Sequence, residues 1–344
     1  MHQLKMLAPA VAALALSSGA LAEEPTAQAA VRSFKFNYGF TVKDVPQDAK
    51  SVKVWVPVPQ TSAWQNIGSI STEGSVEPQQ VTEPQYGNKF LVFDFSSTVP
   101  SADGTYSATV SYDVTRLALR PIDAAGEHPK MFVPPNTQVA LLNSDKLKQR
   151  WLEPDSMVPL DGKIAAEADA TVTLDSPTTI ETARALYDHI VDSVKYDKSG
   201  PAGTWGRGDA LYACDVRAGN CTDFHSLFIG EARSLGIPAR FTIGFSVPND
   251  KPAGDVAGYH CWAEFWDDGL GWLPIDASEA SKNPARRDEL FGGLDANRVD
   301  FAWGRDITLP GAAGAPVNFI IYPYVEIDGK KYESLDKKFS YEDI

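Results

Sequence analysis

Hydrophobic and polar residues alternate in the first third of the chain. The alternation runs through residues 52–59, 90–95 and 106–112, and Gly, Asn, Asp and Pro separate these runs. A period of two is typical of half-buried β-strands, and strands at this spacing indicate an antiparallel sandwich. We therefore predict an all-β, sandwich-like domain over residues 23–120.

The pattern becomes helical in the second half of the chain. Residues 121–175 are rich in proline in places and predict a linker or helical joint, with a helix starting near residues 134–136. Apolar residues at three-and-four spacing then predict a helix that ends near residue 194, capped by Ser176 or Thr178. A second such helix begins at Cys221 and ends at Gly236, and an alternating strand follows over residues 239–247.

The C-terminal part carries weaker signals. Residues 291–306 have the composition of an ordered loop that could border an active-site cleft. Two short apolar runs, residues 319–322 and 324–327, are strand candidates. We expect these strands to complete the sheet of a catalytic domain that spans residues 176–344.

Cys221 lies where a glycine-bearing loop turns into an apolar-striped helix. In the first turn of a helix, unpaired N–H groups and the positive end of the dipole stabilise a thiolate and lower its pKa. The same donors could later hold an oxyanion, which needs a second donor. Tyr196 and Trp205, upstream of the cysteine, are the candidates for that second donor.

A predicted hairpin supplies partners for this thiol. It contains a Tyr-His-Cys-Trp-Ala-Glu run at residues 259–264, an acidic turn and a return strand that ends at Asp276. If the turn is centred on Asp268, His260 lies directly opposite Asp276, with the two Cβ atoms about 4.5–5.5 Å apart. Asp276 would then orient His260, which would take the proton from Cys221.

Three separated blocks carry a family resemblance. The Gly-Asn-Cys run at residues 219–221, the Ala-Arg-Ser-Leu-Gly-Ile-Pro-Ala-Arg run at 232–240, and the histidine and aspartate blocks of the hairpin resemble the transglutaminase-like superfamily of papain-like cysteine enzymes. The resemblance spans roughly residues 176–285. It implies an α+β fold in which a cysteine-bearing helix packs on an antiparallel sheet, with Cys221 as nucleophile, His260 as base and Asp276 as its orienting residue.

The resemblance does not fix the reaction. A thioester formed by attack on an amide gives a peptidase or amidase when water resolves it, and a crosslinking transglutaminase when an amine does. We favour hydrolysis or acyl transfer on a peptide amide, because no amine site or calcium loop is visible. The alternative is a binding or assembly module that has kept the fold, although such a module has no need of an activated thiol.

Other residues offer competing interpretations. His225 is a rival base on the Cys221 helix, whereas His189 is expected to be structural. Asp223 and Arg240 could form an ion pair. A metal site made of Cys221, Cys261 and His260 lacks the close paired spacing of structural zinc sites, so no metal or cofactor is expected.

The three cysteines leave one thiol unpaired. If Cys221 is free, Cys214 and Cys261 could form a disulfide beside the active site, but sequence spacing does not decide this. Alanine often follows the histidine in the family where this chain has Cys261. We expect the Cys261 side chain to point away from the catalytic face.

The N-terminus indicates export. Lys5 precedes an apolar run over residues 6–16, and Ala20-Leu21-Ala22 is a small-x-small cleavage site. Removing residues 1–22 takes away one lysine, so the formal charge changes from -14 to -15. This acidity argues against nucleic acid as a partner. We predict a periplasmic or secreted protein without stable membrane insertion, acting on a peptide or protein substrate that could belong to the cell envelope.

Overall fold

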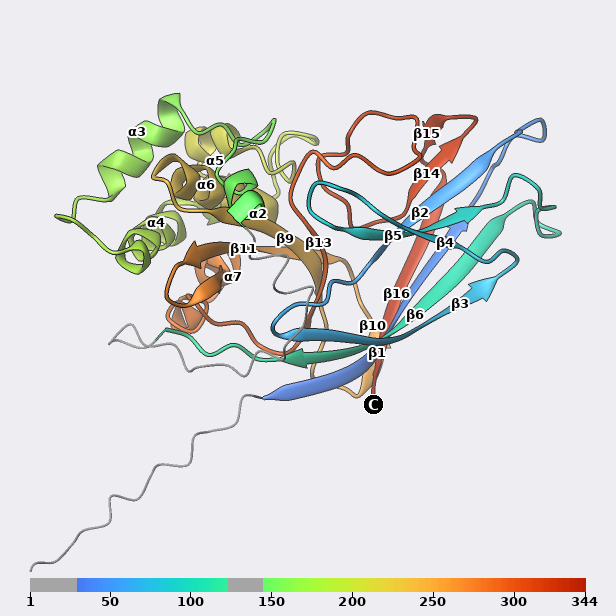
Figure 1. The fold of residues 1–344 in the computed structure, drawn as a ribbon, viewed down its shortest axis with the longest axis horizontal. Coiled ribbons are helices and arrows are strands. Elements are labelled where there is room, and N and C mark those ends of the chain that lie inside the picture. Colours follow the sequence, from blue (N-terminus) through green and yellow to red (C-terminus); the bar gives the residue numbers. More distant parts are fainter. Residues whose placement is uncertain (1–29, 123–144) are drawn as a thin grey trace, which may run out of the picture.

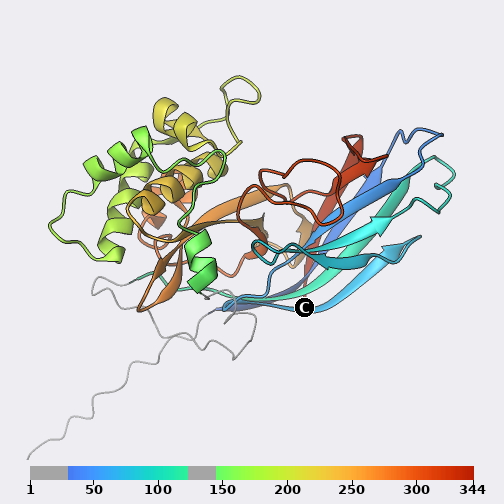
Figure 2. The same ribbon diagram turned by 45° about the horizontal axis from the view of Figure 1, so that its top comes forward.

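The computed structural model describes residues 30–122 and 145–344. Two parts are visible in Figures 1 and 2: long strands form a sandwich, and a smaller sheet is packed with helices beside it. The signal peptide predicted over residues 1–22 and the helix start predicted near residues 134–136 lie outside the described residues. The fold is α+β with antiparallel main sheets, as predicted from the sequence.

The sandwich has two five-stranded sheets. Their strand orders are β10-β16-β1-β6-β3 and β15-β14-β2-β5-β4. Contacts such as that of Phe40 with Phe93, whose ring centroids are 5.3 Å apart, join the two sheets. The strands are β1 (Val31–Val42), β2 (Val52–Val58), β3 (Gln65–Gly74), β4 (Gln79–Thr82), β5 (Lys89–Asp94), β6 (Tyr106–Leu117), β10 (Ala253–Asp255), β14 (Tyr324–Ile327), β15 (Lys330–Tyr332) and β16 (Leu335–Asp343).

The C-terminal strands do not complete the catalytic sheet, contrary to the prediction. β14 pairs with β2, and β16 pairs with β1 along nine residues. Residues 319–322 form no strand. Apolar periodicity predicts that a segment is buried in a sheet, but it does not indicate which sheet. The sequence therefore could not predict that these C-terminal segments pair with strands of the first domain.

The smaller sheet has the order β12-β11-β9-β13. Its strands are β9 (Ala239–Ser246), β11 (Tyr259–Asp267), β12 (Gly271–Ile275) and β13 (Arg298–Trp303). β13 lies within the segment predicted to be a loop, and that prediction is wrong for these residues. Every residue of β13 is buried, including Arg298 and Asp300, so the strand shows no alternation of apolar and polar residues.

Helix α6 (Cys221–Ser234) is the central helix of this part, and its residues 221–233 are all buried. Phe228 packs on Phe265 of the sheet with ring centroids 6.2 Å apart. The surrounding elements are α2 (Asp145–Arg150), α3 (Gly162–Thr171), α4 (Thr179–Ser193), β7 (Lys195–Tyr196), α5 (Ala210–Val216), β8 (Ala218–Gly219), α7 (Ala277–Lys282) and the 3-10 helix Pro284–Arg286. Thr178 caps α4 in a reciprocal capping box, as one of the two predicted candidates.

The sandwich and the smaller sheet share a core. Phe36 of β1 lies 5.1 Å from Phe245 of β9 and 5.5 Å from Phe301 of β13, measured between ring centroids. Arg116 of β6 forms an ion pair of 2.8 Å with Asp300 of β13, and both side chains are fully buried. The sandwich therefore supports the sheet that carries the site.

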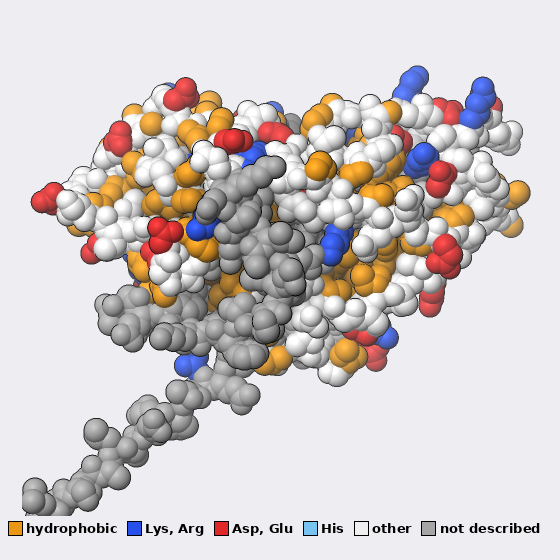
Figure 3. All heavy atoms as spheres, viewed as in Figure 1, with side chains coloured by type: hydrophobic (Ala, Val, Ile, Leu, Met, Phe, Trp, Pro, Cys, Tyr) orange, Lys and Arg blue, Asp and Glu red, His pale blue; other side chains and the backbone are white. Residues whose placement is uncertain are grey.

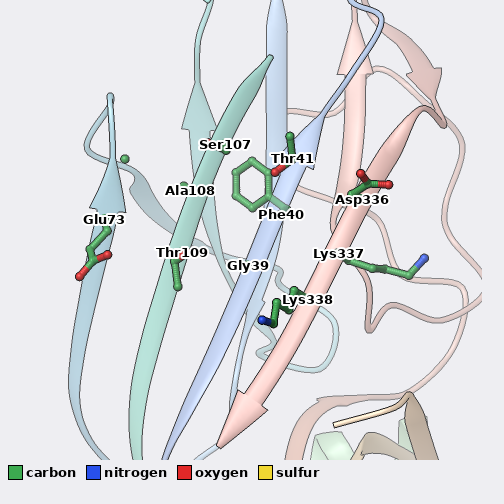
Figure 4. Close-up of a pocket in the computed structure, with 11 residues that line it drawn as sticks. Gly39, Phe40, Thr41, Glu73, Ser107, Ala108, Thr109, Asp336, Lys337 and Lys338 are labelled. Carbon is green, nitrogen blue, oxygen red and sulfur yellow. The ribbon is translucent and has the colours of Figure 1, made fainter. Parts of the chain in front are cut away.

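On the face shown in Figure 3, acidic and basic side chains are scattered. A groove of about 470 Å³ crosses the outer face of the first sheet over Gly39, between Glu73 and Lys338 (Figure 4). None of the helices in the described ranges is long and apolar enough to cross a membrane.

Candidate active site

Cys221 is the first residue of α6, and Asn220 caps the helix. The Asn220 Oδ1 atom accepts hydrogen bonds from the backbone N–H and the hydroxyl of Thr222. Asp223 completes a capping box by accepting from the backbone N–H of Asn220 at 3.0 Å. Cys221 is buried, with 3% of the residue's surface exposed. The cap fixes the start of the helix and so fixes the thiol.

His260 stands between Cys221 and Asp276. Its Nε2 atom lies 2.7 Å from Asp276 Oδ2, and the ring also hydrogen-bonds the Cys221 thiol. Because Nε2 faces the carboxylate, Nδ1 is the nitrogen that faces the sulfur. The structure therefore brings together the three residues that the sequence singled out.

The hairpin reaches this arrangement with a different register. Glu264 lies opposite Pro274, and Trp266 lies opposite Trp272, a shift of two residues from the prediction. Asp276 therefore follows the end of β12 instead of lying directly opposite His260. A two-residue shift keeps each side chain on its predicted face, so the contact survives.

Besides its contact with His260, Asp276 is anchored by groups from two elements. Arg298 of β13 donates to Oδ2 at 2.7 Å, and Oδ1 accepts from the Ser278 hydroxyl and the Glu279 backbone N–H, each at 3.0 Å. The carboxylate also caps α7. Arg298 was missed from the sequence, because its strand was taken for a loop.

The electrostatics favour a thiolate beside an imidazolium. Burial disfavours the charged forms, but Asp276 outweighs this for His260 and raises its pKa to about 9. His260 and Arg298 in turn hold the pKa of Asp276 well below its usual range against the effect of burial. A hydrogen bond from Cys261 and contacts with His260 lower the pKa of Cys221, although burial opposes them.

Comparison with known proteins identifies this part of the chain. Residues 165–277, which include the three residues above, match the family model of the transglutaminase-like superfamily. The chain carries a transglutaminase-like domain.

Relatives of the transglutaminase-like domain differ in how much of the chain they cover. An uncharacterised protein of Haemophilus influenzae is 27% identical over 332 residues, 87% of each chain. A protein-glutamine gamma-glutamyltransferase of Pseudomonas aeruginosa is 31% identical over 81 residues, 22% of this chain and 12% of that protein. The structure of a proposed cysteine protease of Cytophaga hutchinsonii shares the fold, with 20% identity, a TM-score of 0.55 and coverage of 92% of this chain and 99% of that chain.

A second histidine, His225, and a second thiol, Cys261, lie beside Cys221, His260 and Asp276. His225 has Nδ1 3.7 Å from the Cys261 sulfur and Nε2 3.6 Å from Asp276 Oδ1. Burial lowers the pKa of His225 to about 4, so this ring is neutral. Both its nitrogens face these groups, which disfavours it as the rival base.

The prediction that Cys261 points away from the catalytic face is wrong. Its side chain faces α6, where it approaches His225 and hydrogen-bonds the Cys221 thiol. The two residues alternate along β11, so His260 and Cys261 point to opposite faces of the strand. Side chains on both faces of β11 can therefore reach the start of α6 and Asp276.

All three cysteines are free thiols in the structure, so the disulfide considered between Cys214 and Cys261 is not formed. The Cys214 thiol instead lies 2.9 Å from the carboxylate of Glu167. The same carboxylate binds His189 at 2.9 Å. His189 is thus part of a polar cluster between helices, as expected of a structural residue.

The loop before the nucleophile is fixed by Asp223. This carboxylate accepts from the backbone N–H groups of Gly206 and Gly208 at 2.6 and 3.0 Å. The ion pair imagined between Asp223 and Arg240 is absent, since Arg240 binds Glu264 at 2.8 Å.

The two predicted oxyanion donors have different surroundings. The Trp205 indole N–H donates to the Gly200 carbonyl at 3.0 Å, so it already has an acceptor. Tyr196 packs against Phe224 of α6 and lies beside Lys282 of α7. Among the residues that the structure describes, no cluster of three or more His, Cys, Asp or Glu is arranged to hold a metal ion.

Proposed function

We propose that this protein is an exported thiol enzyme that cleaves or transfers peptide acyl groups through a Cys221 thioester. The observation that carries the proposal is the position of His260, which hydrogen-bonds Cys221 and lies 2.7 Å from Asp276. The N-terminal signal sequence supports export to the periplasm or beyond.

The chemistry follows from the charges. The Cys221 thiolate attacks the amide carbonyl, and the His260 imidazolium gives its proton to the departing amine. Asp276 holds the ring in place and stabilises its charged form. His260, now neutral, then takes a proton from the second nucleophile, which attacks the thioester and releases the acyl group.

The second nucleophile decides the class of reaction. Water makes the protein a peptidase or amidase, and the sequence favours this reaction or acyl transfer on a peptide amide. An amine makes it an acyl transferase, and the similarity to the Pseudomonas aeruginosa gamma-glutamyltransferase favours this second candidate. A pure binding module would gain nothing from the lowered pKa of the Cys221 thiol.

The first test is acylation by p-nitrophenyl acetate. Intact-mass analysis should show one acetyl group on the wild type and on the control Cys214→Ala, and none on Cys221→Ala. Peptide and cell-wall fragments are then screened with and without hydroxylamine, and hydroxamate products would identify an acyl transferase. A wild-type protein that p-nitrophenyl acetate does not acylate would refute the proposal.

The pH dependence gives an independent check. His260 is protonated below its raised pKa of about 9 and loses its proton as the pH rises through that value. Amide turnover should therefore fall above pH 9, because the leaving amine needs a proton. Acylation by the nitrophenyl ester should persist there, since nitrophenolate leaves without one. Loss of both reactions at the same pH would contradict the assigned role of His260.

A further inference from the structure

Two hydrogen-bond donors beside the nucleophile have no acceptor. The backbone N–H of Cys221, at the first position of α6, donates to no atom of the described residues. The second donor is the hydroxyl of Tyr259, the first residue of β11 and the neighbour of His260.

The Tyr259 hydroxyl is held at the start of α6 by Asn220. The Asn220 Nδ2 atom donates to the phenol oxygen at 3.1 Å. Asn220 itself cannot turn freely, because its Oδ1 atom binds both the backbone N–H and the hydroxyl of Thr222. Since the phenol oxygen acts as the acceptor in this bond, its own hydrogen remains to be donated. No acceptor for that hydrogen is found in the described part of the chain.

Tyr259 also lies on the appropriate face of its strand. Tyr259 and Cys261 alternate with His260, so they share the face of β11 that meets α6, where Cys261 hydrogen-bonds Cys221. The phenol ring packs between Phe319 and Tyr322, with centroid distances of 6.2 and 5.9 Å. Burial raises the pKa of Tyr259, and the charge of Cys221 raises it further, so the hydroxyl keeps its proton.

We infer that Tyr259 is a catalytic residue, whose hydroxyl forms an oxyanion hole together with the backbone N–H of Cys221. This assignment rests on the proposed acyl-transfer function. When the thiolate attacks a carbonyl, the oxygen gains negative charge and needs donors that are already in place. Asn220 holds the Tyr259 hydroxyl at the start of α6, next to the backbone N–H of Cys221. His260 reaches the thiol from the other face of β11, where it can protonate the leaving group.

The alternatives fit less well. The Trp205 indole N–H already donates a hydrogen bond to the Gly200 carbonyl. Tyr196 also lies near Cys221, because burial and then the charge of Cys221 raise its pKa. Its ring lies beside Lys282 of α7, and no hydrogen bond within the described residues fixes its hydroxyl. Of these three candidates among the described residues, Tyr259 is the one whose oxygen is held by a hydrogen bond and whose own hydrogen is unused.

The test compares two reactions of the same thiol. Acylation by p-nitrophenyl acetate passes through an oxyanion, whereas alkylation by iodoacetamide at a saturated carbon does not. In Tyr259→Phe the acylation rate should fall by about 10²–10³-fold, the loss typical of one oxyanion-hole donor. The alkylation rate of Cys221 should stay within about twofold of wild type, which also shows that the site is folded.

Two further variants separate the donor from its surroundings. Tyr322→Phe removes a hydroxyl from the ring that packs on Tyr259 and should acylate at the wild-type rate. Asn220→Ser keeps a capping side chain but removes the amide that holds the phenol, so its acylation should fall while alkylation persists. A partial loss, smaller than that of Tyr259→Phe, is expected.

Several results would overturn the inference. Unchanged acylation in Tyr259→Phe would remove the hydroxyl from the mechanism, as would a large loss in Tyr196→Phe alone. Equal losses in Tyr259→Phe and Tyr322→Phe would assign the effect to packing. A wild-type protein that is never acylated would refute the proposed function itself, which distinguishes the two failures.

Discussion

At the scale of single residues, one carboxylate serves two histidines with opposite charge states. Asp276 lies 2.7 Å from His260, whose pKa is raised to about 9, and 3.6 Å from His225, whose pKa is lowered to about 4. The short contact and the neighbouring Cys221 thiolate stabilise an imidazolium at His260. At His225 the weaker contact does not offset burial. The site therefore holds a single imidazolium at neutral pH.

Cys261 should tune the nucleophile without touching the substrate. Its thiol hydrogen-bonds the Cys221 thiolate, and a hydrogen bond to a charged group contributes about 1.5–3 kcal/mol. In Cys261→Ala the pKa of Cys221 should rise, and iodoacetamide alkylation at pH 5 should slow by about tenfold or more. The measurement is the alkylation rate between pH 4 and pH 9, roughly the range over which thiolates in proteins titrate.

Two matched variants control for the loss of packing. Cys261→Ser keeps a donor at this position and should retain most of the wild-type reactivity. Cys214→Ala removes a thiol that bonds Glu167 instead and should leave the pH profile of Cys221 unchanged. An alkylation profile in Cys261→Ala identical to wild type would show that Cys261 does not tune the thiolate.

The sequence located the proposed nucleophile and its two proposed partners but not their supporting residues. The pattern of a helix start marks Cys221, and the pattern of a hairpin marks His260 and Asp276. Arg298 and Tyr259 carry no such pattern. Arg298 approaches from a strand that looks like a loop, and the role of Tyr259 depends on a side-chain contact with Asn220 that no sequence spacing encodes.

At the scale of elements, the hairpin shows how a wrong register can still give the right contact. The turn has three residues between Asp267 and Gly271 instead of being centred on Asp268, and Gly271 has a φ of 84°. A positive φ at the end of such a loop favours glycine. Moving the centre of the turn from residue 268 to residue 269 shifts the pairing by two residues, so each side chain keeps its face while its opposite partner changes.

The contact between β9 and β13 requires a glycine at position 244. A Cβ atom there would lie 1.8 Å from the Val299 carbonyl oxygen and 2.8 Å from its carbon, which are backbone atoms that cannot rotate away. Gly244→Ala should therefore destabilise the protein by about 1–3 kcal/mol or more. It should also slow Cys221 acylation, because β13 carries Arg298 to Asp276.

Gly254→Ala is the matched control. A Cβ atom at this exposed position would have its nearest neighbour at 3.5 Å, an ordinary contact. Urea denaturation should separate the two variants clearly. Equal midpoints for Gly244→Ala and Gly254→Ala would mean that the strands part more easily than their spacing indicates.

At the scale of the whole molecule, the last strand of the chain completes the first domain. β16 pairs with β1, and β10, which comes from the middle of the catalytic part, pairs with β16. The sandwich is therefore built from strands near both ends of the chain and from β10, which lies between them in the sequence. Local periodicity over residues 52–59 and 106–112 predicted the strands β2 and β6, but it does not identify pairing partners that lie hundreds of residues away.

The ion pair between Arg116 and Asp300 should hold the two parts together. Both side chains are fully buried, and Asp300 has no other charged partner among the described residues. Removing one member leaves the other as an uncompensated buried charge, which typically costs about 3–5 kcal/mol. Arg116→Met should therefore lower the urea midpoint strongly. It should also weaken the site, because Asp300 lies on the same strand as Arg298.

The double variant Arg116→Met/Asp300→Val distinguishes charge from packing. Replacing a buried ion pair by apolar residues of similar volume is often neutral or stabilising, so the double variant should recover most of the stability lost in Arg116→Met. Iodoacetamide labelling of Cys221 should recover with it, because the strand that carries Arg298 is again fixed against the sandwich. If the double variant is no more stable than Arg116→Met, the two parts depend on the packing of the arginine side chain and not on its charge.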